Sequence, residues 1–178
     1  MKYSLKCLYA VALLLVLCAA TRATATPWQP YGLPADSVTI SGQVTHPLTL
    51  SQEHLRRFNA VTGKDLKIVG VKGDIKKTLH SWKGVLLTTL LDSAGIRLAP
   101  KERGRCYIVV RGTDNYTTLY SWNDLFNNPT GSHVVLLYEE NGQPITTDGP
   151  FVMVCTTDKI TGPRHVKWVN RIEVASLP

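Results

Sequence analysis

The sequence lacks the short motifs by which common enzyme classes are recognised. It contains no GxSxG nucleophile turn, no HExxH zinc motif, no P-loop and no dinucleotide fingerprint. Its five histidines are scattered, without the spacing of metal ligands. The aspartates Asp114, Asp148 and Asp158 lie in expected turns, where this residue commonly bonds to the local backbone. No pair of carboxylates stands out as an acid–base couple, so the motifs indicate no recognisable catalytic machinery.

Cysteine is also scarce. Two of the four cysteines lie in an apolar N-terminal segment, which leaves Cys106 and Cys155 in the rest of the chain. These two do not have the CxxC spacing of a redox or zinc site. Each lies at the end of an apolar run, as expected for a small buried hydrophobic residue. An oxidising compartment would also permit a disulfide between them, and the sequence leaves both interpretations open.

Only one long hydrophobic run is present, and it lies at the N-terminus. Lys2 and Lys6 precede the apolar segment Leu8–Ala20, and Ala23–Ala25 forms a small-x-small cleavage site. The run is shorter than the roughly 20 residues of a comfortable membrane span. We therefore expect residues 1–25 to be a signal peptide and the mature protein to be periplasmic or secreted, with no membrane insertion after the leader is removed.

The charge balance gives little support to nucleic-acid binding. The chain has a formal net charge of +7, and removing the leader with its three basic residues lowers this to +4. The remaining positive charge is spread along the chain and does not form a stripe. We expect no nucleic-acid partner, and an anionic or electron-rich small molecule is the better candidate ligand.

Short apolar patterns predict a proline-rich arm over residues 26–37 and one α+β domain over residues 38–178, with mixed, mainly antiparallel sheets. A helix is expected to begin at Ser51, a second to cover Gly84–Gly95 and a third to begin at Ser121. The dipeptide Asn141-Gly142 predicts a tight hairpin. Strands are expected at Val38–Val44, Leu66–Val71, Arg105–Arg111, Tyr116–Tyr120, His133–Glu139, Phe151–Cys155 and Val166–Val174.

The last two expected strands bracket a polar loop. The first is almost wholly apolar and the second alternates, so both should belong to the core. The loop between them, residues 156–165, is dense in hydrogen-bonding side chains. A polar loop held between two core strands can form a binding site on a rigid frame. A solvated hairpin loop is the simpler alternative, and the residues alone do not decide between the two.

Landmarks along the chain resemble the molybdopterin-binding domain of the sulfite oxidase family. They occur in the family's order from Val38 to the end, and they are Ser41–Val44, Pro47–Ser51, Trp82–Leu87, Thr113–Tyr116, Tyr138–Pro144, Gly149-Pro150 and Val166–Val174. The resemblance implies a sulfite oxidase-type α+β fold. It also implies a pterin ligand, either molybdopterin-like or a simple pterin.

The chain departs from this family where the metal is held. The family's thiolate ligand lies in a turn that aligns with residues 69–74, and Val71 takes the cysteine position. Valine offers no lone pair to a soft metal. The family's Arg-Asn-His segment before the first strand also has no counterpart in the proline-rich arm. The resemblance therefore implies a branch that keeps the pterin-binding scaffold, with molybdenum unlikely.

This branch resembles exported pterin-binding proteins that act as ligand-loaded partners of membrane signalling proteins. Whether the chain is an enzyme stays open, and a binding role without redox chemistry is favoured. One alternative is a periplasmic molybdopterin-dependent oxidoreductase with an atypical metal ligand. Another is an adaptor whose pocket is vestigial and which binds its partner through its surface.

The resemblance also indicates where the pterin would bind. By position, the pocket residues are Arg164, His165, Lys167, Thr156, Thr157, Asp158, Asp114, Tyr116, Lys72 and Asp74. A carboxylate can accept hydrogen bonds from the 2-amino group and N3–H of a pterin, and a basic side chain can bond its carbonyl, its N5 or a phosphate tail. An aromatic ring could stack on the bicycle. Candidates for that stacking are Trp28, Trp82, Tyr116 and Trp122, with core packing favoured for Trp82.

Overall fold

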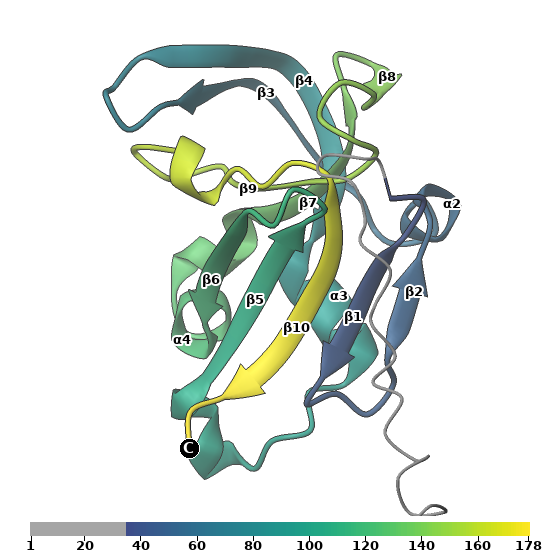
Figure 1. The fold of residues 1–178 in the computed structure, drawn as a ribbon, viewed down its shortest axis with the longest axis vertical. Helices are drawn as coiled ribbons and strands as arrows, with labels where there is room; N and C mark the ends of the chain where they lie inside the picture. The colour runs from purple at the N-terminus through teal and green to yellow at the C-terminus, as the bar shows by residue number, and fades with distance from the viewer. Residues whose placement is uncertain (1–34) are drawn as a thin grey trace, which may run out of the picture.

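The computed structural model describes residues 35–178, which form two five-stranded sheets (Figure 1). The leader, Trp28 and most of the arm lie outside the described residues. In the first sheet the only parallel pairing joins β1 to β10, and its neighbouring strands are antiparallel. The strands lie in the order β2 (Leu48–Leu50), β1 (Val38–Gly42), β10 (Val169–Ser176), β5 (Cys106–Gly112) and β6 (Thr117–Ser121).

The second sheet is antiparallel throughout and contains a long hairpin that extends beyond the end of the first sheet (Figure 1). This hairpin consists of β3 (Val61–Val69) and β4 (Ile75–Leu86). The remaining strands are β7 (Val134–Glu140), which pairs with β4, and then β8 (Gln143–Pro144) and β9 (Val152–Cys155), which both pair with β7. The mainly antiparallel sheets with few short helices confirm the predicted α+β class.

Helices are few and short among the described residues. They are α2 (Gln52–Leu55), α3 (Leu87–Ala94) and α4 (Trp122–Phe126), with 3-10 turns η1 (Pro100–Arg105), η2 (Pro129–His133) and η3 (Gly162–Arg164). The apolar face of α3 is fully buried in the larger of two hydrophobic clusters. A smaller cluster, which includes Ile68, Leu79 and Ile145, lies beneath the long hairpin. Within residues 35–178, no helix has the length and apolarity needed to cross a lipid bilayer.

Several boundaries differ from those predicted. The strand β4 takes in Gly84, which was expected to begin the helix. In the sheet, Gly84 packs closely against β7, and a Cβ at this position would lie 2.4 Å from the carbonyl oxygen of Leu136. The glycine is therefore explained by this strand contact and not by the start of a helix. The last strand begins at Val169 instead of Val166, since Trp168 has a left-handed φ of 47° that interrupts it.

Other local predictions are confirmed. Asn141 and Gly142 both have positive φ and connect β7 to β8 in a tight hairpin. Ser51 and Ser121 cap their helices by accepting a hydrogen bond from a backbone N–H three residues on. The two cysteines, Cys106 and Cys155, are free thiols buried in the larger core cluster, which answers the question the sequence left open.

Candidate functional site

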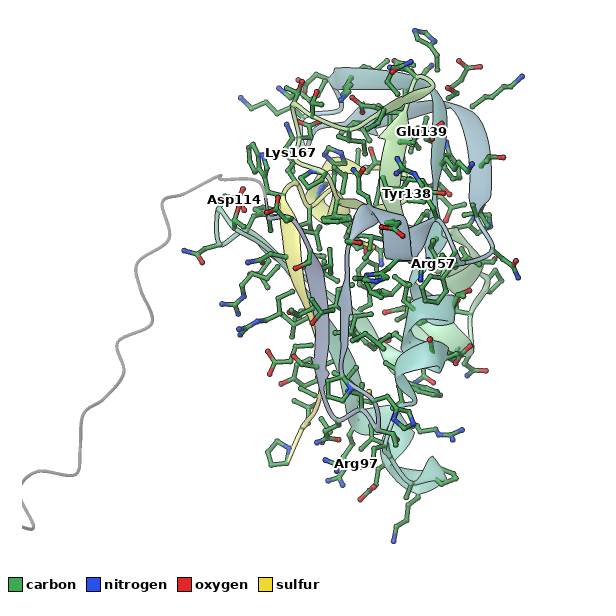
Figure 2. All side chains as sticks on the ribbon, turned by 90° about the vertical axis from the view of Figure 1, so that its right-hand side faces the viewer. Arg57, Arg97, Asp114, Tyr138, Glu139 and Lys167 are labelled. Atoms are coloured by element: carbon green, nitrogen blue, oxygen red, sulfur yellow. The ribbon has the colours of Figure 1, made fainter. Side chains whose placement is uncertain are left out.

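A cavity of about 740 Å³ opens where the long hairpin overhangs the first sheet. We call it the lysine pocket because three lysines line it. Lys167 precedes β10 and Asp114 follows β5, so both lie at the same end of the first sheet (Figure 2). The complete lining is Ile68, Lys76, Lys77, Asp114, Tyr116, Glu140, Thr147, Asp148, Gly162, His165 and Lys167.

The centre of the lysine pocket is the buried carboxylate of Asp148. The Lys167 Nζ lies 2.7 Å from its Oδ1, and the Lys77 Nζ lies 3.0 Å from its Oδ2. Lys77 also contacts Glu140, with 2.7 Å between Nζ and Oε2. Only 6% of the Asp148 side chain is exposed, against 29% of Lys77 and 41% of Lys167. Two ammonium groups therefore share one buried acid, and Lys167 is the more accessible of the two.

These contacts keep the network charged. Burial acts to raise the pKa of Asp148, but hydrogen bonds from Lys167 and Lys77 outweigh it, so the pKa lies below its usual value. Burial acts in the opposite direction on Lys77, and its hydrogen bonds to Glu140 and Asp148 leave the pKa raised. Asp148 is therefore a carboxylate at neutral pH and can only accept hydrogen bonds.

His165 contributes an uncharged ring to the same pocket. Burial lowers its pKa to about 4, and the nearby Asp148 carboxylate only partly opposes that effect. The imidazole is therefore neutral at physiological pH. A neutral ring can donate one hydrogen bond and accept another, which suits a heterocyclic ligand that carries both donors and acceptors.

The outer wall of the pocket is the turn after β5. The Asp114 Oδ1 accepts a hydrogen bond from the Tyr116 N–H at 2.9 Å, and Asn115 has a left-handed φ of 65°. The Tyr116 hydroxyl donates to the Pro163 carbonyl oxygen at 2.9 Å. This contact joins the turn to the loop of residues 156–165, which we call the C-terminal loop. The two walls of the pocket are thereby fixed relative to each other.

The C-terminal loop is attached to the edge of β3 through Thr161. This buried hydroxyl accepts from the Val69 N–H at 2.7 Å and donates to the Lys67 carbonyl oxygen at 2.9 Å. The Thr161 side chain thus makes hydrogen bonds to the backbone at the edge of β3, as a neighbouring strand would. Gly162 follows it closely against the hairpin, where a Cβ would lie 2.8 Å from the Val69 carbonyl oxygen.

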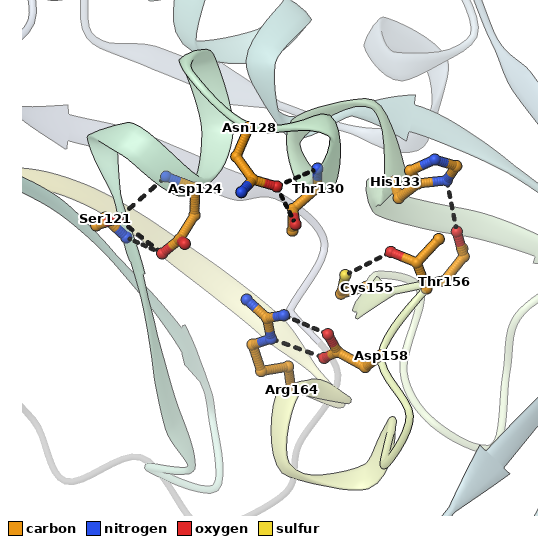
Figure 3. A network of polar contacts seen from close by, with 10 residues as sticks. Ser121, Asp124, Asn128, Thr130, His133, Cys155, Thr156, Asp158 and Arg164 are labelled. Carbon is orange, nitrogen blue, oxygen red and sulfur yellow. Dashed lines mark hydrogen bonds and ion pairs between the residues drawn. The ribbon is translucent and has the colours of Figure 1, made fainter.

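Arg164 and Asp158 form a separate cluster on the other side of this loop. The guanidinium makes a two-pronged contact with the carboxylate, including 2.7 Å between Nε and Oδ2, and this contact is drawn in Figure 3. The same guanidinium lies 5.0 Å from the ring centroid of Tyr120, whose pKa is raised by burial. Hydrogen bonding to Asp158 raises the pKa of Arg164 further above its usual range. We call this arrangement the arginine brace.

The structure therefore divides the predicted site residues. Asp114, Tyr116, His165 and Lys167 line the lysine pocket. Thr156, Thr157 and Asp158 line a second cavity of about 460 Å³, together with β3 residues and Trp82. Arg164, Lys72 and Asp74 line neither cavity, although Asp74 forms an ion pair with Lys76 at the rim of the lysine pocket.

Sequence reasoning missed several pocket residues, and the most important is Asp148. It was considered only as a turn residue, although its place directly before Gly149-Pro150, at the start of a buried strand, could have pointed to it. The other missed residues are Ile68, Lys76, Lys77, Glu140, Thr147 and Gly162. Lys76 and Lys77 lie on β4, and their position on this strand brings them to the pocket.

No cysteine of residues 35–178 lines the lysine pocket. Val71 lies in the turn between β3 and β4 with 79% of its surface exposed. The free thiols of Cys106 and Cys155 are buried in the core, at 2% and 0% exposure. Across residues 35–178, no group of three or more His, Cys, Asp or Glu side chains is placed to hold a metal ion. The hydrogen-bonding groups, in contrast, converge on one cavity.

Residues 31–178 match the family described as the oxidoreductase molybdopterin binding domain. Mitochondrial sulfite oxidase from Mus musculus is 32% identical over 99 residues, which are 53% of this chain and 18% of that protein. The Homo sapiens enzyme is 31% identical over 97 residues, or 52% and 17% of the two chains. The chain thus matches less than a fifth of the length of these relatives.

A solved structure shares the fold. The sulfane dehydrogenase SoxCD from Paracoccus pantotrophus superimposes with a TM-score of 0.58 at 22% sequence identity. The match covers 78% of this chain and 37% of that one. At this identity the likeness concerns the fold alone, and it agrees with the sheet arrangement described above.

Proposed function

Because the chain belongs to the oxidoreductase molybdopterin binding domain family, we propose that the lysine pocket binds a pterin without molybdenum redox chemistry. The observation that carries this proposal is the buried carboxylate of Asp148 in an open cavity lined by hydrogen-bonding groups. A pterin presents a 2-amino group and an N3–H on one edge. A carboxylate accepts from both, and such charge-assisted bonds are stronger than bonds between neutral groups.

The remaining groups suit the rest of a pterin ring. Lys167 is the more exposed partner of Asp148, so it is the lysine that can turn toward a ligand carbonyl or ring nitrogen. Lys77 keeps Glu140 as a second partner and would hold the carboxylate in place. The neutral ring of His165 and the Tyr116 side chain complete the walls. In this arrangement the protein binds and orients the ring.

The charges of the pocket favour a pterin without a phosphate tail. Every lysine lining the pocket already contacts a carboxylate: Lys76 contacts Asp74, and Lys77 and Lys167 share Asp148. A phosphate would have to compete with these acids, and no arginine of residues 35–178 lines the cavity. An uncharged pterin requires no such exchange, so we infer that it binds more tightly than a phosphorylated one.

We further propose that the protein is exported and acts as a ligand-loaded partner of a membrane signalling protein. The leader pattern in residues 1–25 supports export. The valine in place of a thiolate supports a binding role over electron transfer. A periplasmic molybdopterin-dependent oxidoreductase with an atypical ligand is the second candidate, and the membership of an oxidoreductase family favours it.

One experiment separates the two candidates. Mature protein is purified, and the supernatant released by heat is assayed for pterin fluorescence while molybdenum is measured on the same sample. We expect pterin without molybdenum, and molybdenum in near-equal proportion to the chain would favour the oxidoreductase. If neither is found, neutral and phosphorylated pterins are titrated into wild type, Asp148→Asn and the exposed control Asp92→Asn. Equal affinity for all three proteins would exclude Asp148 from the site.

A further inference from the structure

The outer face of the first sheet carries two arginines side by side. Arg171 on β10 and Arg111 on β5 are direct cross-strand partners, and both are exposed. Directly opposite side chains in an antiparallel pair point to the same face and lie close together. Figure 1 views this sheet with β5, β10 and β1 in front, and no other described element covers them.

Neither arginine has a partner among the described residues. Within residues 35–178 neither guanidinium forms an ion pair, a side-chain hydrogen bond or a ring contact, and Glu173, two residues along the same face, pairs with neither of them. Residues 1–34 contain no aspartate or glutamate, so that part of the chain cannot supply a carboxylate. Two like charges placed opposite each other destabilise a sheet, and no carboxylate among residues 35–178 pairs with them.

The surroundings have the composition of a protein interface. The arginine pair lies in one row across the sheet with Thr39, Thr49 and Thr117. The next row on the same face contains Ser41, Glu173, Val109 and Leu119, and 57% of Leu119 is exposed. Further along the face is Tyr107, paired with Ala175. Arginine and tyrosine are enriched in protein interfaces and lysine is depleted, and this face carries no lysine.

We propose that this arginine face docks an acidic segment of a partner protein. Two adjacent guanidinium groups can bind carboxylates in two-pronged contacts, the threonine hydroxyls can bond the partner's backbone, and the exposed leucine supplies apolar contact. A membrane surface fits less well, because stable electrostatic attachment requires a larger cluster of basic residues. The face is therefore assigned to a protein that presents carboxylates beside an apolar side chain.

The arginine face adjoins the lysine pocket. Beyond Arg111, β5 ends at Gly112 and continues into the turn that carries Asp114 and Tyr116. β10 begins two residues after Lys167. A partner on this face would contact the strands that support the pocket wall. The docking itself does not depend on the identity of the ligand, although it gives the signalling role proposed above a physical surface.

The test uses the full chain in cells of its source organism, with a photo-crosslinking benzoylphenylalanine in place of Leu119. Mass spectrometry identifies the cross-linked peptide, which is then synthesised and titrated into purified protein. We expect a peptide rich in Asp and Glu whose affinity falls as salt is raised. The double variant Arg111→Gln/Arg171→Gln should bind it at least about tenfold more weakly, because two charge-assisted contacts are lost. The exposed control Arg97→Gln should bind as wild type does.

The proposal is overturned if no protein cross-links from this position, if the captured peptide lacks carboxylates, or if the double variant binds the peptide as wild type does. If wild type and the double variant bind equally to vesicles containing anionic lipid, the membrane alternative is excluded. If the double variant binds these vesicles much more weakly but keeps its affinity for the peptide, the assignment to a protein partner is overturned. Thermal unfolding checks that the variants are folded. Asp148→Asn is included in the peptide titration, because a variant that loses pterin yet keeps the peptide separates failure of the pocket from failure of the docking face.

Discussion

The lysine pocket and the arginine brace lie on opposite sides of one loop, and each contains a carboxylate paired with basic side chains. In the brace, Arg164 binds Asp158 in a two-pronged contact, and the guanidinium also lies over the ring of Tyr120. In the pocket, Asp148 is shared by two lysines, one of them well exposed, beside an open cavity. The Arg164 and Asp158 side chains are 26% and 15% exposed, whereas the Lys167 side chain is 41% exposed and its ammonium is the one best placed to turn toward a ligand. We therefore assign a structural role to the brace and, under the proposed function, a recognition role to the pocket.

The largest effect should come from Asp148→Asn. The change removes the negative charge and replaces one of the two acceptor oxygens that we assign to the pterin edge by an NH2 donor, and a hydrogen bond to a charged group contributes about 1.5–3 kcal/mol. Pterin affinity should fall by about a hundredfold, measured by fluorescence titration. Asp158→Asn should leave the affinity of the folded protein within a few-fold of wild type. If Asp158→Asn lowered pterin affinity about a hundredfold and Asp148→Asn did not, Asp158 would be the recognition residue instead.

Arg164→Ala should act on stability instead. Removing one partner of a buried ion pair costs about 3–5 kcal/mol, and we expect about 2–3 kcal/mol here because 26% of the Arg164 side chain is exposed. Urea unfolding measures the change in the free energy of unfolding, with the exposed residue in Arg97→Ala as the control. A variant of normal stability that no longer binds pterin would show that Arg164 belongs to the ligand site.

Lowering the pH should distinguish the lysine pocket from the arginine brace, because His165 lines the pocket. Its pKa is about 4 in the folded protein and near 6.5 when unfolded, so the folded state resists a proton that the unfolded state accepts. The stability of the domain should therefore fall as pH drops from 6.5 to 4, by about 1–2 kcal/mol because the ring is only partly shielded from solvent. The variant His165→Gln should lose this slope, whereas the exposed control His46→Gln should keep it. An unchanged slope in His165→Gln would contradict a neutral, buried imidazole. The lowered pKa of Asp148 affects stability in a more acidic range. Its stabilising contribution is present above the unfolded-state pKa of about 3.8 and is lost as the pH falls through the lower pKa of the folded state.

The smallest effect should come from Tyr116→Phe. The change removes the hydrogen bond to the Pro163 carbonyl oxygen, which joins the two walls of the pocket. At an exposed position such a bond contributes about 0.5–1 kcal/mol, so pterin affinity should fall about two- to fivefold. Tyr107→Phe, on the outer sheet face, should have no effect on pterin affinity. A loss of affinity equal to that of Asp148→Asn would place the main recognition on the turn instead.

Much of the fold could be predicted from local signals. Asn141-Gly142 and the capping serines act through neighbouring backbone groups, so their sequence is sufficient to identify them. The start of α3 was missed because Gly84 is selected by a distant carbonyl on β7, which periodicity does not reveal. The interruption at Trp168 likewise depends on a close approach to Gly149.

The structure brings only some of the predicted site residues together. Those that follow β5 and those that precede β10 line one cavity, but position in the chain could not show how the charged side chains pair. Asp158 and Arg164 are six residues apart and satisfy each other, whereas Asp148 is joined to Lys77 across 71 residues. Such long-range pairing depends on the overhang of the β3–β4 hairpin. That overhang becomes visible only when the sheets are assembled (Figure 1).

The most direct test of the central claim is the amount of pterin and molybdenum carried by wild-type protein and by Asp148→Asn, measured in parallel. The account predicts a pterin in the wild type, its loss from the variant, and molybdenum in neither. Molybdenum in near-equal proportion to the wild-type chain would contradict the assignment of a metal-free pterin pocket. Pterin retained equally by both proteins would contradict the role of Asp148.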